Sequence, residues 1–426
     1  MRVLLSSIGS RGDVQPILAV ALELRKLGHQ SVLLVPPNFK EWVESFGIEC
    51  LPVGVDVRKA STRMARGSMP KPTKEQMRQL ASFTVRQQFQ ASLVAARGCD
   101  VIVAGGALQT AARSVAEALQ IPYVYAAYCP AALPSADHPP PKMRTRIRSQ
   151  ALPGLINRWL WRRDERSWDY FFLDAVNEQR KELGLGPVMG HVARHVATNA
   201  PWLASDPVLG PAASYSSSLR VTQTGAWLLA DSSPLPDALE EFLAAGEPPV
   251  YFGFGSMVGA AQAGPMLVEV ARALGRRAII SQGWADLSFV GGSHDCMSVG
   301  DVSHERLFGR VAAIVHHGGA GTSVNAARCG KPQVVVPHNY DQFYWARRVE
   351  KLGIGVAGPQ AKELTAGGLI SALRRCFKPE AAAAAQSLAV RVELYGARNA
   401  AERLIGEFAD MRRTGPGGGR PLLQPG

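Results

Sequence analysis

The fold class is decided by residues 2–35, which read RVLLSSIGSRGDVQPILAVALELRKLGHQSVLLV. Arg2–Ile8 is a short apolar run, Val14–Leu27 has apolar residues at helical spacing and ends at a glycine, and Ser31–Val35 is apolar again. Two strands joined through a helix lie parallel in one sheet. This stretch therefore predicts an α/β fold built on a parallel sheet.

The same alternation of strand-like and helix-like segments continues to about residue 126 and begins again at Pro249. A Pro-rich, basic and Trp-rich segment (130–190) and a Ser/Pro-rich stretch after residue 225 separate the two series. Residues 56–73, with two prolines, are expected to be irregular. We predict two doubly wound domains facing across a cleft. The expected divisions are 1–225, a linker at 226–248, 249–396, a C-terminal helix at 397–412 and a disordered tail at 413–426.

Composition indicates a globular protein. The 426 residues are 46% hydrophobic and 19% charged, which excludes disordered, collagenous and coiled-coil classes. No apolar run reaches the roughly 18 to 20 residues of a membrane-spanning helix, and the N-terminal run is too short for a secretory signal. The six cysteines show no CxxC or metal-ligand spacing, so we expect reduced thiols in a cytoplasmic protein.

The net charge of +12 is concentrated in residues 142–166, which contain eight basic residues. No zinc-finger or RRM-like module accompanies them, so no nucleic-acid partner is expected. The stretch also has apolar residues at helical spacing, while its arginines fall on another arc. This pattern fits either weak peripheral contact with an anionic membrane, at the inner membrane face, or an ordinary helix whose Trp residues face the core. The apolar residues are Leu152, Leu155, Ile156, Trp159 and Leu160, and the arginines are Arg158, Arg162, Arg163 and Arg166.

Two motifs follow predicted strands, where ligands of doubly wound sheets bind. In Gly9–Pro16, GSRGDVQP, Asp13 stands at a helix start and either accepts a proton from a ligand or caps the helix. The motif lacks the third glycine of GxGxxG, which argues against a nicotinamide cofactor. In His316–Ser323, HHGGAGTS, a glycine turn opens a helix. Bare N–H groups there suit a diphosphate, although a packing histidine before a plain turn remains the alternative.

Other loops are expected to end at the same sheet edge. Asp341 and Gln342 follow another strand, and a carboxylate beside an amide can bind vicinal sugar hydroxyls; capping by Asp341 is the alternative. Trp284 either lies flat against a nucleobase or anchors the core. Because adjacent residues on an extended chain point in opposite directions, the His pair is a poor metal site.

Taken together, GSRGDVQP, HHGGAGTS and DQFYWARRVEKLGIG resemble the nucleotide-sugar glycosyltransferases of family one over about residues 1–410. The resemblance is to the subgroup that includes sterol glucosyltransferases and bacterial enzymes of the vancomycin and macrolide pathways. It implies the GT-B fold, with the acceptor on the domain 1–225, the nucleotide-sugar donor on the domain 249–396, and the C-terminal helix packing back on the first domain.

The resemblance also implies roles for individual residues. Asp13 matches the general base, although many relatives carry His there, and Ser10, Gly12 and Gln109 match acceptor contacts. His317 matches the histidine that contacts the diphosphate. The other donor contacts implied are Ser256, Trp284, Val302, Gly319, Ala320, Gly321, Thr322, Asp341 and Gln342.

The expected activity is an inverting, metal-independent transfer of glucose or a deoxysugar from UDP-glucose or a dTDP-sugar. The acceptor would be a hydroxyl of a lipophilic small molecule, such as a polyketide or sterol-like natural product. No cofactor and no metal are expected. A nucleotide-sugar epimerase or a catalytically silent auxiliary partner on the same fold are the alternatives.

Overall fold

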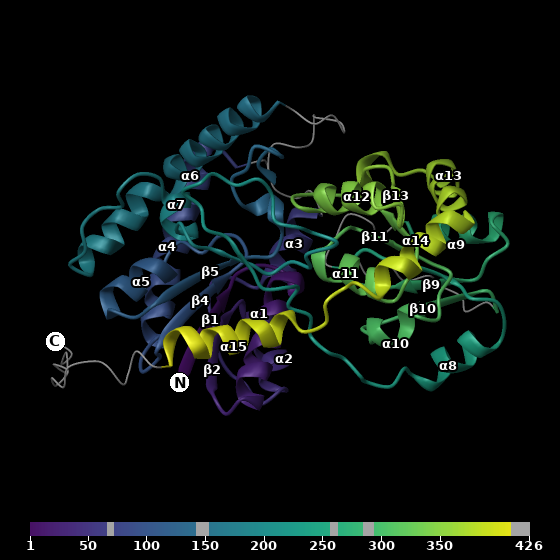
Figure 1. Cartoon of the computed structure of the whole chain (residues 1–426), viewed down its shortest axis with the longest axis horizontal. Coiled ribbons are helices and arrows are strands. Elements are labelled where there is room, and N and C mark those ends of the chain that lie inside the picture. The colour runs from purple at the N-terminus through teal and green to yellow at the C-terminus, as the bar shows by residue number, and fades with distance from the viewer. Residues whose placement is uncertain (66–71, 142–152, 256–262, 284–293, 410–426) are drawn as a thin grey trace.

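A computed structural model describes residues 1–65, 72–141, 153–255, 263–283 and 294–409. The chain forms two parallel sheets, one of seven strands and one of six, each covered by helices on both faces (Figure 1). The first has the order β3-β2-β1-β4-β5-β6-β7 and the second the order β10-β9-β8-β11-β12-β13. The prediction of two doubly wound parallel sheets is confirmed.

The first sheet contains all the strands predicted before residue 130 and two more. Its strands are β1 (Arg2–Ser7), β2 (Gln30–Val35), β3 (Glu49–Pro52), β4 (Val101–Gly105), β5 (Tyr123–Ala127), β6 (Trp202–Leu203) and β7 (Thr222–Gln223). The last two have only two residues each, too few to show a period in the sequence. Its helices are α1 (Arg11–Lys26), α2 (Lys40–Glu44), α3 (Val57–Ala65), α4 (Lys74–Ala95), α5 (Ala112–Leu119), α6 (Gly154–Glu182) and α7 (Val192–Ala197), with 3-10 turns at Pro37–Phe39 and Pro130–Ala132.

The second sheet contains the strands predicted after residue 249. They are β8 (Val250–Gly253), β9 (Ala278–Ser281), β10 (Cys296–Val299), β11 (Ala313–His316), β12 (Gln333–Val335) and β13 (Gly355–Ala357). The helices that follow residue 230 are α8 (Asp237–Ala244), α9 (Gly264–Ala273), α10 (His304–Phe308), α11 (Ala320–Arg328), α12 (Gln342–Lys351), α13 (Ala366–Cys376), α14 (Pro379–Ala389) and α15 (Gly396–Phe408), with a 3-10 turn at Ala361–Glu363.

One expectation about an irregular segment is corrected, since residues 57–65, expected to be irregular, form α3. The second half of the expected linker 226–248 contains α8, whose Leu239 and Leu243 are buried against Tyr251 and Ile279 of the second sheet. Both segments are short helices, and local propensity alone gives little helix at that length. The expected domain division stays a prediction.

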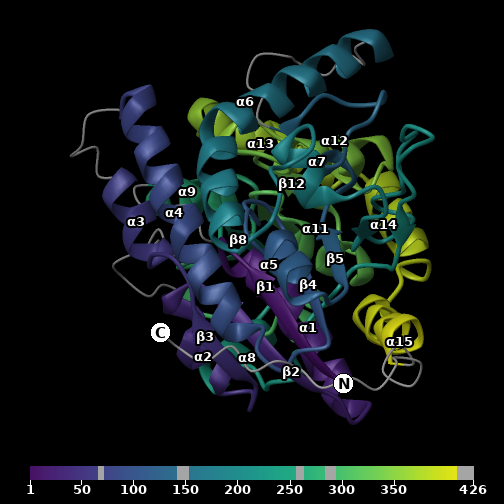
Figure 2. The ribbon, with the colours of Figure 1, turned by 90° about the vertical axis from the view of Figure 1, so that its left-hand side faces the viewer.

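The period-2 alternation of strand side chains divides the first domain into two cores. Leu5 faces the layer that holds α1, while Leu4 faces the layer that holds α4. The last helix, α15, lies beside α1, as Figures 1 and 2 show. Ala400 and Leu404 of α15 are fully buried there. A helix from the C-terminal end of the chain therefore completes the core of the first domain.

The two domains meet in an interface of their own. Leu209 and Ala226 of the first half form one apolar cluster with Trp345 and Val349 of α12. The chain crosses between the domains twice, and the crossings touch, because a Cβ on Gly396 would lie 2.4 Å from the carbonyl oxygen of Ala226. Only glycine permits that approach.

Candidate active site between the domains

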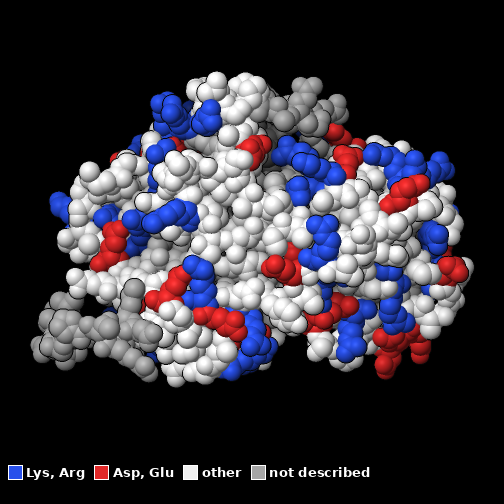
Figure 3. Space-filling view, viewed as in Figure 1, with Lys and Arg blue, Asp and Glu red and all other residues white. Residues whose placement is uncertain are grey.

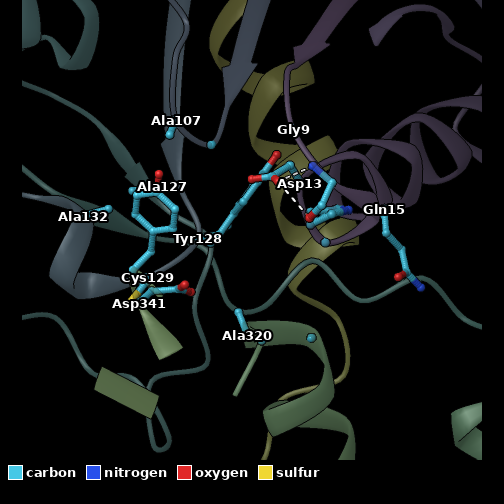
Figure 4. A pocket seen from close by; sticks show the side chains of 18 of the residues that line it. Gly9, Asp13, Gln15, Ala107, Ala127, Tyr128, Cys129, Ala132, Ala320 and Asp341 are labelled. Atoms are coloured by element: carbon cyan, nitrogen blue, oxygen red, sulfur yellow. Dashed lines mark hydrogen bonds between the residues drawn. The ribbon is translucent and has the colours of Figure 1, made fainter. Parts of the chain in front are cut away.

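A cavity of about 2090 Å³ lies between the two sheets. Its walls include the loops that follow β1, β4 and β5 in the first domain and β8 to β12 in the second. These loops stand at the carboxyl ends of the strands, where doubly wound sheets bind ligands. Figure 4 shows Asp13 and Tyr128 from the first domain on one side, and Ala320 and Asp341 from the second on the other.

Asp13 stands in the first turn of α1 and lines the cavity. Its Oδ2 accepts hydrogen bonds from the backbone N–H of Ser10 (2.8 Å) and from the Ser10 hydroxyl (3.1 Å), drawn as dashed lines in Figure 4. Asp13 therefore caps the helix and faces the cavity at once. One carboxylate oxygen is committed to Ser10, so the carboxylate has a fixed orientation.

The environment of Asp13 raises its pKa to about 6. Burial is the main cause, and the charge of Asp341 adds to it, while the two hydrogen bonds from Ser10 act in the opposite direction. A carboxylate with this pKa is ionised at neutral pH and still holds a proton strongly enough to remove one from a hydroxyl during bond formation. The site is thus suited to general-base chemistry.

Two glycines leave room for this carboxylate. A Cβ on Gly9 would lie 2.2 Å from Asp13 Oδ2, and a Cβ on Gly106 would lie 3.0 Å from Oδ1. The same position on Gly106 would be 3.3 Å from Cε2 of Tyr128, so the ring of Tyr128 forms the neighbouring wall. Tyr128 was not among the residues predicted for the site, and its only signal in the sequence is its place directly after β5.

The two adjacent histidines have different environments. His316 is buried, its Nδ1 accepts a hydrogen bond from the backbone of Gly318 (3.1 Å), and its Nε2 therefore carries the proton donated to Gln333 (2.9 Å). His317 lines the cavity. Burial, with smaller effects of the neighbouring histidines, lowers the pKa of His317 to about 3. The alternative of a packing histidine thus describes His316, whereas His317 is available to a ligand as a neutral hydrogen-bonding group.

The glycine turn presents the start of α11 to the same space. Gly319 is the N-cap and supplies no capping side chain. Ala320, Gly321 and Thr322 line the cavity, and the first intrahelical bond of this turn is donated by Ser323. Free N–H groups and the positive end of the helix dipole favour an anion here. A Cβ on Gly319 would lie 2.6 Å from Nε2 of His317, so the turn needs glycine to pack against that ring.

Asp341 and Gln342 both line the cavity at the start of α12. Asp341 Oδ2 accepts a hydrogen bond from the indole N–H of Trp345 (3.0 Å). The side-chain oxygen of Gln342 accepts bonds from the backbone of His338 (2.7 Å) and Asn339 (2.9 Å). Gln342 therefore holds its own loop with its carbonyl oxygen, and a contact with a sugar would have to use its NH2 group.

Two family descriptions match the chain. They are the glycosyltransferase family 28 N-terminal domain, over residues 3–136, and the erythromycin biosynthesis protein CIII-like C-terminal domain, over residues 294–402. Glycosyltransferase GtfE of Amycolatopsis orientalis is 41% identical over 98% of this chain and 100% of its own length. The vancomycin aglycone glucosyltransferase of the same organism is 40% identical over 97% of this chain and 99% of its own. The chain belongs to the glycosyltransferase family that these two domain descriptions and these relatives represent.

The crystal structure of glycosyltransferase VinC in complex with dTDP is similar to this glycosyltransferase in fold. The TM-score is 0.65 at 20% sequence identity, over 97% of this chain and 100% of that one. The fold is therefore GT-B, as the resemblance implied, and the assignment as a glycosyltransferase is likewise confirmed.

The remaining predicted site residues of this glycosyltransferase divide into three groups. Ser10, Gly12 and Val302 line the cavity. Ser256 and Trp284 lie outside the described residues. Gln109 does not line the cavity: it is 1% exposed, and its amide bonds to Ser6 and to the carbonyl of Gly105. The structure thus places the Gln109 side chain against β1 and β4, and its contact with the acceptor stays a prediction.

The basic, Trp-rich stretch differs from the expectation. In α6, Leu160 and Trp161 are buried, whereas Leu155, Ile156 and Trp159 are 73%, 43% and 57% exposed. The exposed apolar residues share the outer arc of the helix with arginines, and the guanidinium of Arg163 lies 5.9 Å from the ring of Trp159. The expected separation of apolar and basic arcs is wrong for this helix. Leu152 lies outside the described residues.

Within the described parts of the chain, no helix is long and apolar enough to cross a bilayer. The same residues contain no group of three His, Cys, Asp or Glu side chains arranged to hold a metal ion.

Proposed function

We propose that this glycosyltransferase moves a sugar from a nucleoside-diphosphate sugar to a hydroxyl of a lipophilic natural product, with inversion and without a metal. One observation carries the proposal. A fixed carboxylate of raised pKa, Asp13, and an anion-binding helix start beside His317 line the same cavity from opposite domains.

On the acceptor side, Asp13 removes the proton of the attacking hydroxyl as the new C–O bond forms. Ser10 holds one carboxylate oxygen, which directs the other toward the acceptor. Gly9 and Gly106 allow the carboxylate to lie close to the backbone. The proton passes to Asp13 when the alcohol oxygen bonds to the anomeric carbon.

On the donor side, negative charge builds on the diphosphate as the glycosidic bond breaks. The N–H groups of Ala320, Gly321 and Thr322 with the α11 dipole, and the neutral imidazole of His317, are placed to stabilise it. We propose that these groups fulfil the role that a divalent cation has in other transferases. Activity should then persist in EDTA; loss of activity that magnesium or manganese restores would contradict this mechanism.

The placement of these groups supports the proposal of inversion. The proposed base, Asp13, stands on the first domain, and the diphosphate leaves toward the second. In a single displacement the acceptor hydroxyl therefore attacks the anomeric carbon from the face opposite the leaving diphosphate. The test is the anomeric configuration of the product, measured from its proton coupling constant by NMR. A retained configuration would reject the proposal of a single displacement.

The acceptor half of the cavity suits a large, partly aromatic molecule. Its lining contains aromatic side chains from α2, α6 and the loops after α2, β5, β6 and β7, including Trp42, Phe46, Tyr128, Trp161, Trp168, Tyr215 and Trp227. Such a wall binds lipophilic rings through apolar burial and ring packing. The vancomycin aglycone named by one relative is an acceptor of this general kind, so we propose an aromatic natural product over a sterol.

We propose UDP-glucose or a dTDP-sugar as the donor. The name of a relative specifies a glucosyltransferase, and the VinC crystal holds dTDP. Hydrolysis of a panel of UDP- and dTDP-sugars tests this point without knowledge of the acceptor. Conversion of the donor to its epimer with no release of nucleotide would instead favour the epimerase alternative, and no turnover of any donor would favour the silent partner.

We also propose that the outer face of α6 makes weak peripheral contact with an anionic membrane surface. The described residues exposed between 153 and 170 include four arginines and no acidic residue; Arg158 and Arg162 also line the cavity, whereas Arg163 and Arg166 do not. Three exposed apolar side chains lie among them at the start of the helix. Arginine with Trp and Leu is the combination that binds lipid headgroup regions. Figure 3 shows basic side chains along this edge of the molecule.

A further inference from the structure

Arg11 connects the helix that carries Asp13 to the opposite domain. Its guanidinium lies over the ring of Trp42, 4.8 Å from the centroid, and forms an ion pair with Asp301. Trp42 belongs to α2 in the first domain, whereas Asp301 follows β10 in the second. Arg11 is the one residue of GSRGD with a charge-paired contact across the cavity among the described ion pairs.

The loop that holds Asp301 belongs to the donor side of the cavity. The next residue, Val302, lines the cavity, and Ser303 caps α10. The hydroxyl of Ser303 donates a hydrogen bond to the carbonyl of Asp231, which fixes the interdomain segment to the same loop. A donor that orders the loop after β10 therefore also affects Asp301, the ion-pair partner of Arg11.

On the side of the first domain, Arg11 has a fixed position relative to Asp13. Arg11 is the first residue of α1, two residues before Asp13, and Ser10 binds the Asp13 carboxylate directly. Stacking on Trp42 also limits the conformations of the guanidinium, so less entropy is lost when it meets Asp301. A displacement of Arg11 consequently changes where Asp13 points.

We propose that Arg11 is a positioning residue. Its ion pair with Asp301 holds the two domains in the arrangement in which Asp13 faces the donor. This inference rests on the proposed role of Asp13 as the base. Because Arg11 and Asp301 are 39% and 83% exposed, the pair is solvated and should change the population of the aligned state by only about two- to fivefold.

The test uses the full-length enzyme and hydrolysis of UDP-glucose or dTDP-glucose, whichever it accepts. Arg11→Gln and Asp301→Asn should each lower kcat by about two- to fivefold, while the dissociation constant of UDP or dTDP changes less. The double variant should be no slower than either single variant, since both remove one interaction. Arg11→Asp combined with Asp301→Arg should recover activity lost in Arg11→Asp.

Arg310→Gln is the control, because Arg310 is as exposed as Arg11 and pairs with Glu240 within the second half of the chain. Unlike Arg11 and Asp301, neither residue of this pair lines the cavity. High salt should bring the wild-type kcat down to that of Asp301→Asn, and should leave that variant unchanged. Additive effects of the two neutral substitutions, or no recovery in the charge swap, would overturn the inference while leaving the proposed function intact. Near-normal activity of Asp13→Asn would overturn both.

Discussion

The chemistry at the scale of single residues depends on one carboxylate. We predict that Asp13→Asn lowers turnover by about 10² to 10⁴, the range for loss of a general base, while nucleotide affinity hardly changes. In the wild type, kcat/KM should fall as the pH drops below about 6, because the raised pKa of Asp13 leaves it protonated there. The measurement is a pH–rate profile of both proteins. A normal rate for Asp13→Asn would leave this residue only a helix cap.

The charged Asp13 carboxylate should also lower the free energy of unfolding at neutral pH. The folded pKa of about 6 lies above the ordinary 3.8, so the folded protein binds more protons between these values. The contribution of Asp13 to the free energy of unfolding therefore becomes less favourable as the pH rises through this window. We predict that Asp13→Asn is more stable than wild type at neutral pH, by at most about 3 kcal/mol, and gains less near pH 4.5.

Denaturant unfolding at both pH values measures this difference. Asn can still accept both bonds from Ser10, so the comparison isolates the charge. A variant less stable than wild type at neutral pH would show that the carboxylate is net stabilising and that its burial costs less than the shifted pKa implies.

His317 should act as a neutral hydrogen-bonding group before nucleotide binds. We predict that His317→Ala weakens UDP or dTDP binding by about tenfold and lowers turnover as well, since diphosphate is contacted in both ground and transition states. His317→Gln should retain part of the affinity. The measurement is calorimetric titration, with His338→Ala as control, since His338 does not line the cavity. Equal affinity in wild type and His317→Ala would exclude contact with the diphosphate.

At the scale of elements, α6 presents a testable surface. We predict that the protein co-sediments with phosphatidylglycerol vesicles at low salt and is released by high salt, since each aligned arginine contributes about 1 kcal/mol near an anionic surface. Trp159→Ser and Arg163→Gln should each reduce the bound fraction, and neither residue lines the cavity. Leu80→Ser is the control, because Leu80 is similarly exposed on α4. Recovery of all protein in the supernatant at low salt would reject the membrane proposal.

At the scale of the whole molecule, α15 joins the C-terminal end of the chain to the first domain. Leu404 is fully buried against α1, so Leu404→Ala should lower the free energy of unfolding by about 2 to 5 kcal/mol. Leu394→Ala, at an exposed position before α15, should change it by no more than about 0.5 kcal/mol. Calorimetry resolves which domain is affected. A shift confined to the second domain would contradict the packing described here.

Local periodicity and chain order predict two parallel sheets, apart from the short strands β6 and β7, and the loops at the carboxyl ends of their strands. Strands such as β1 and β4 are apolar runs between helical segments, and crossovers through helices make such strands parallel. His317 and Asp341 follow the neighbouring strands β11 and β12, so their position at one edge of the second sheet follows from chain order, whereas Asp13 stands at the corresponding edge of the first sheet. These inferences need only local periodicity and the geometry common to all parallel sheets.

Tertiary structure alone decided what each side chain contacts. Gln109 follows β4 as a cavity residue would, yet a local turn buries it. Leu155 and Leu160 share one helical pattern, but only packing against the domain determines that the first is exposed and the second buried. The pairing of Arg11 with Asp301 joins residues 290 positions apart. Periodicity describes one element at a time, whereas burial, pKa and ion pairs depend on which other elements approach, and so on the fold as a whole.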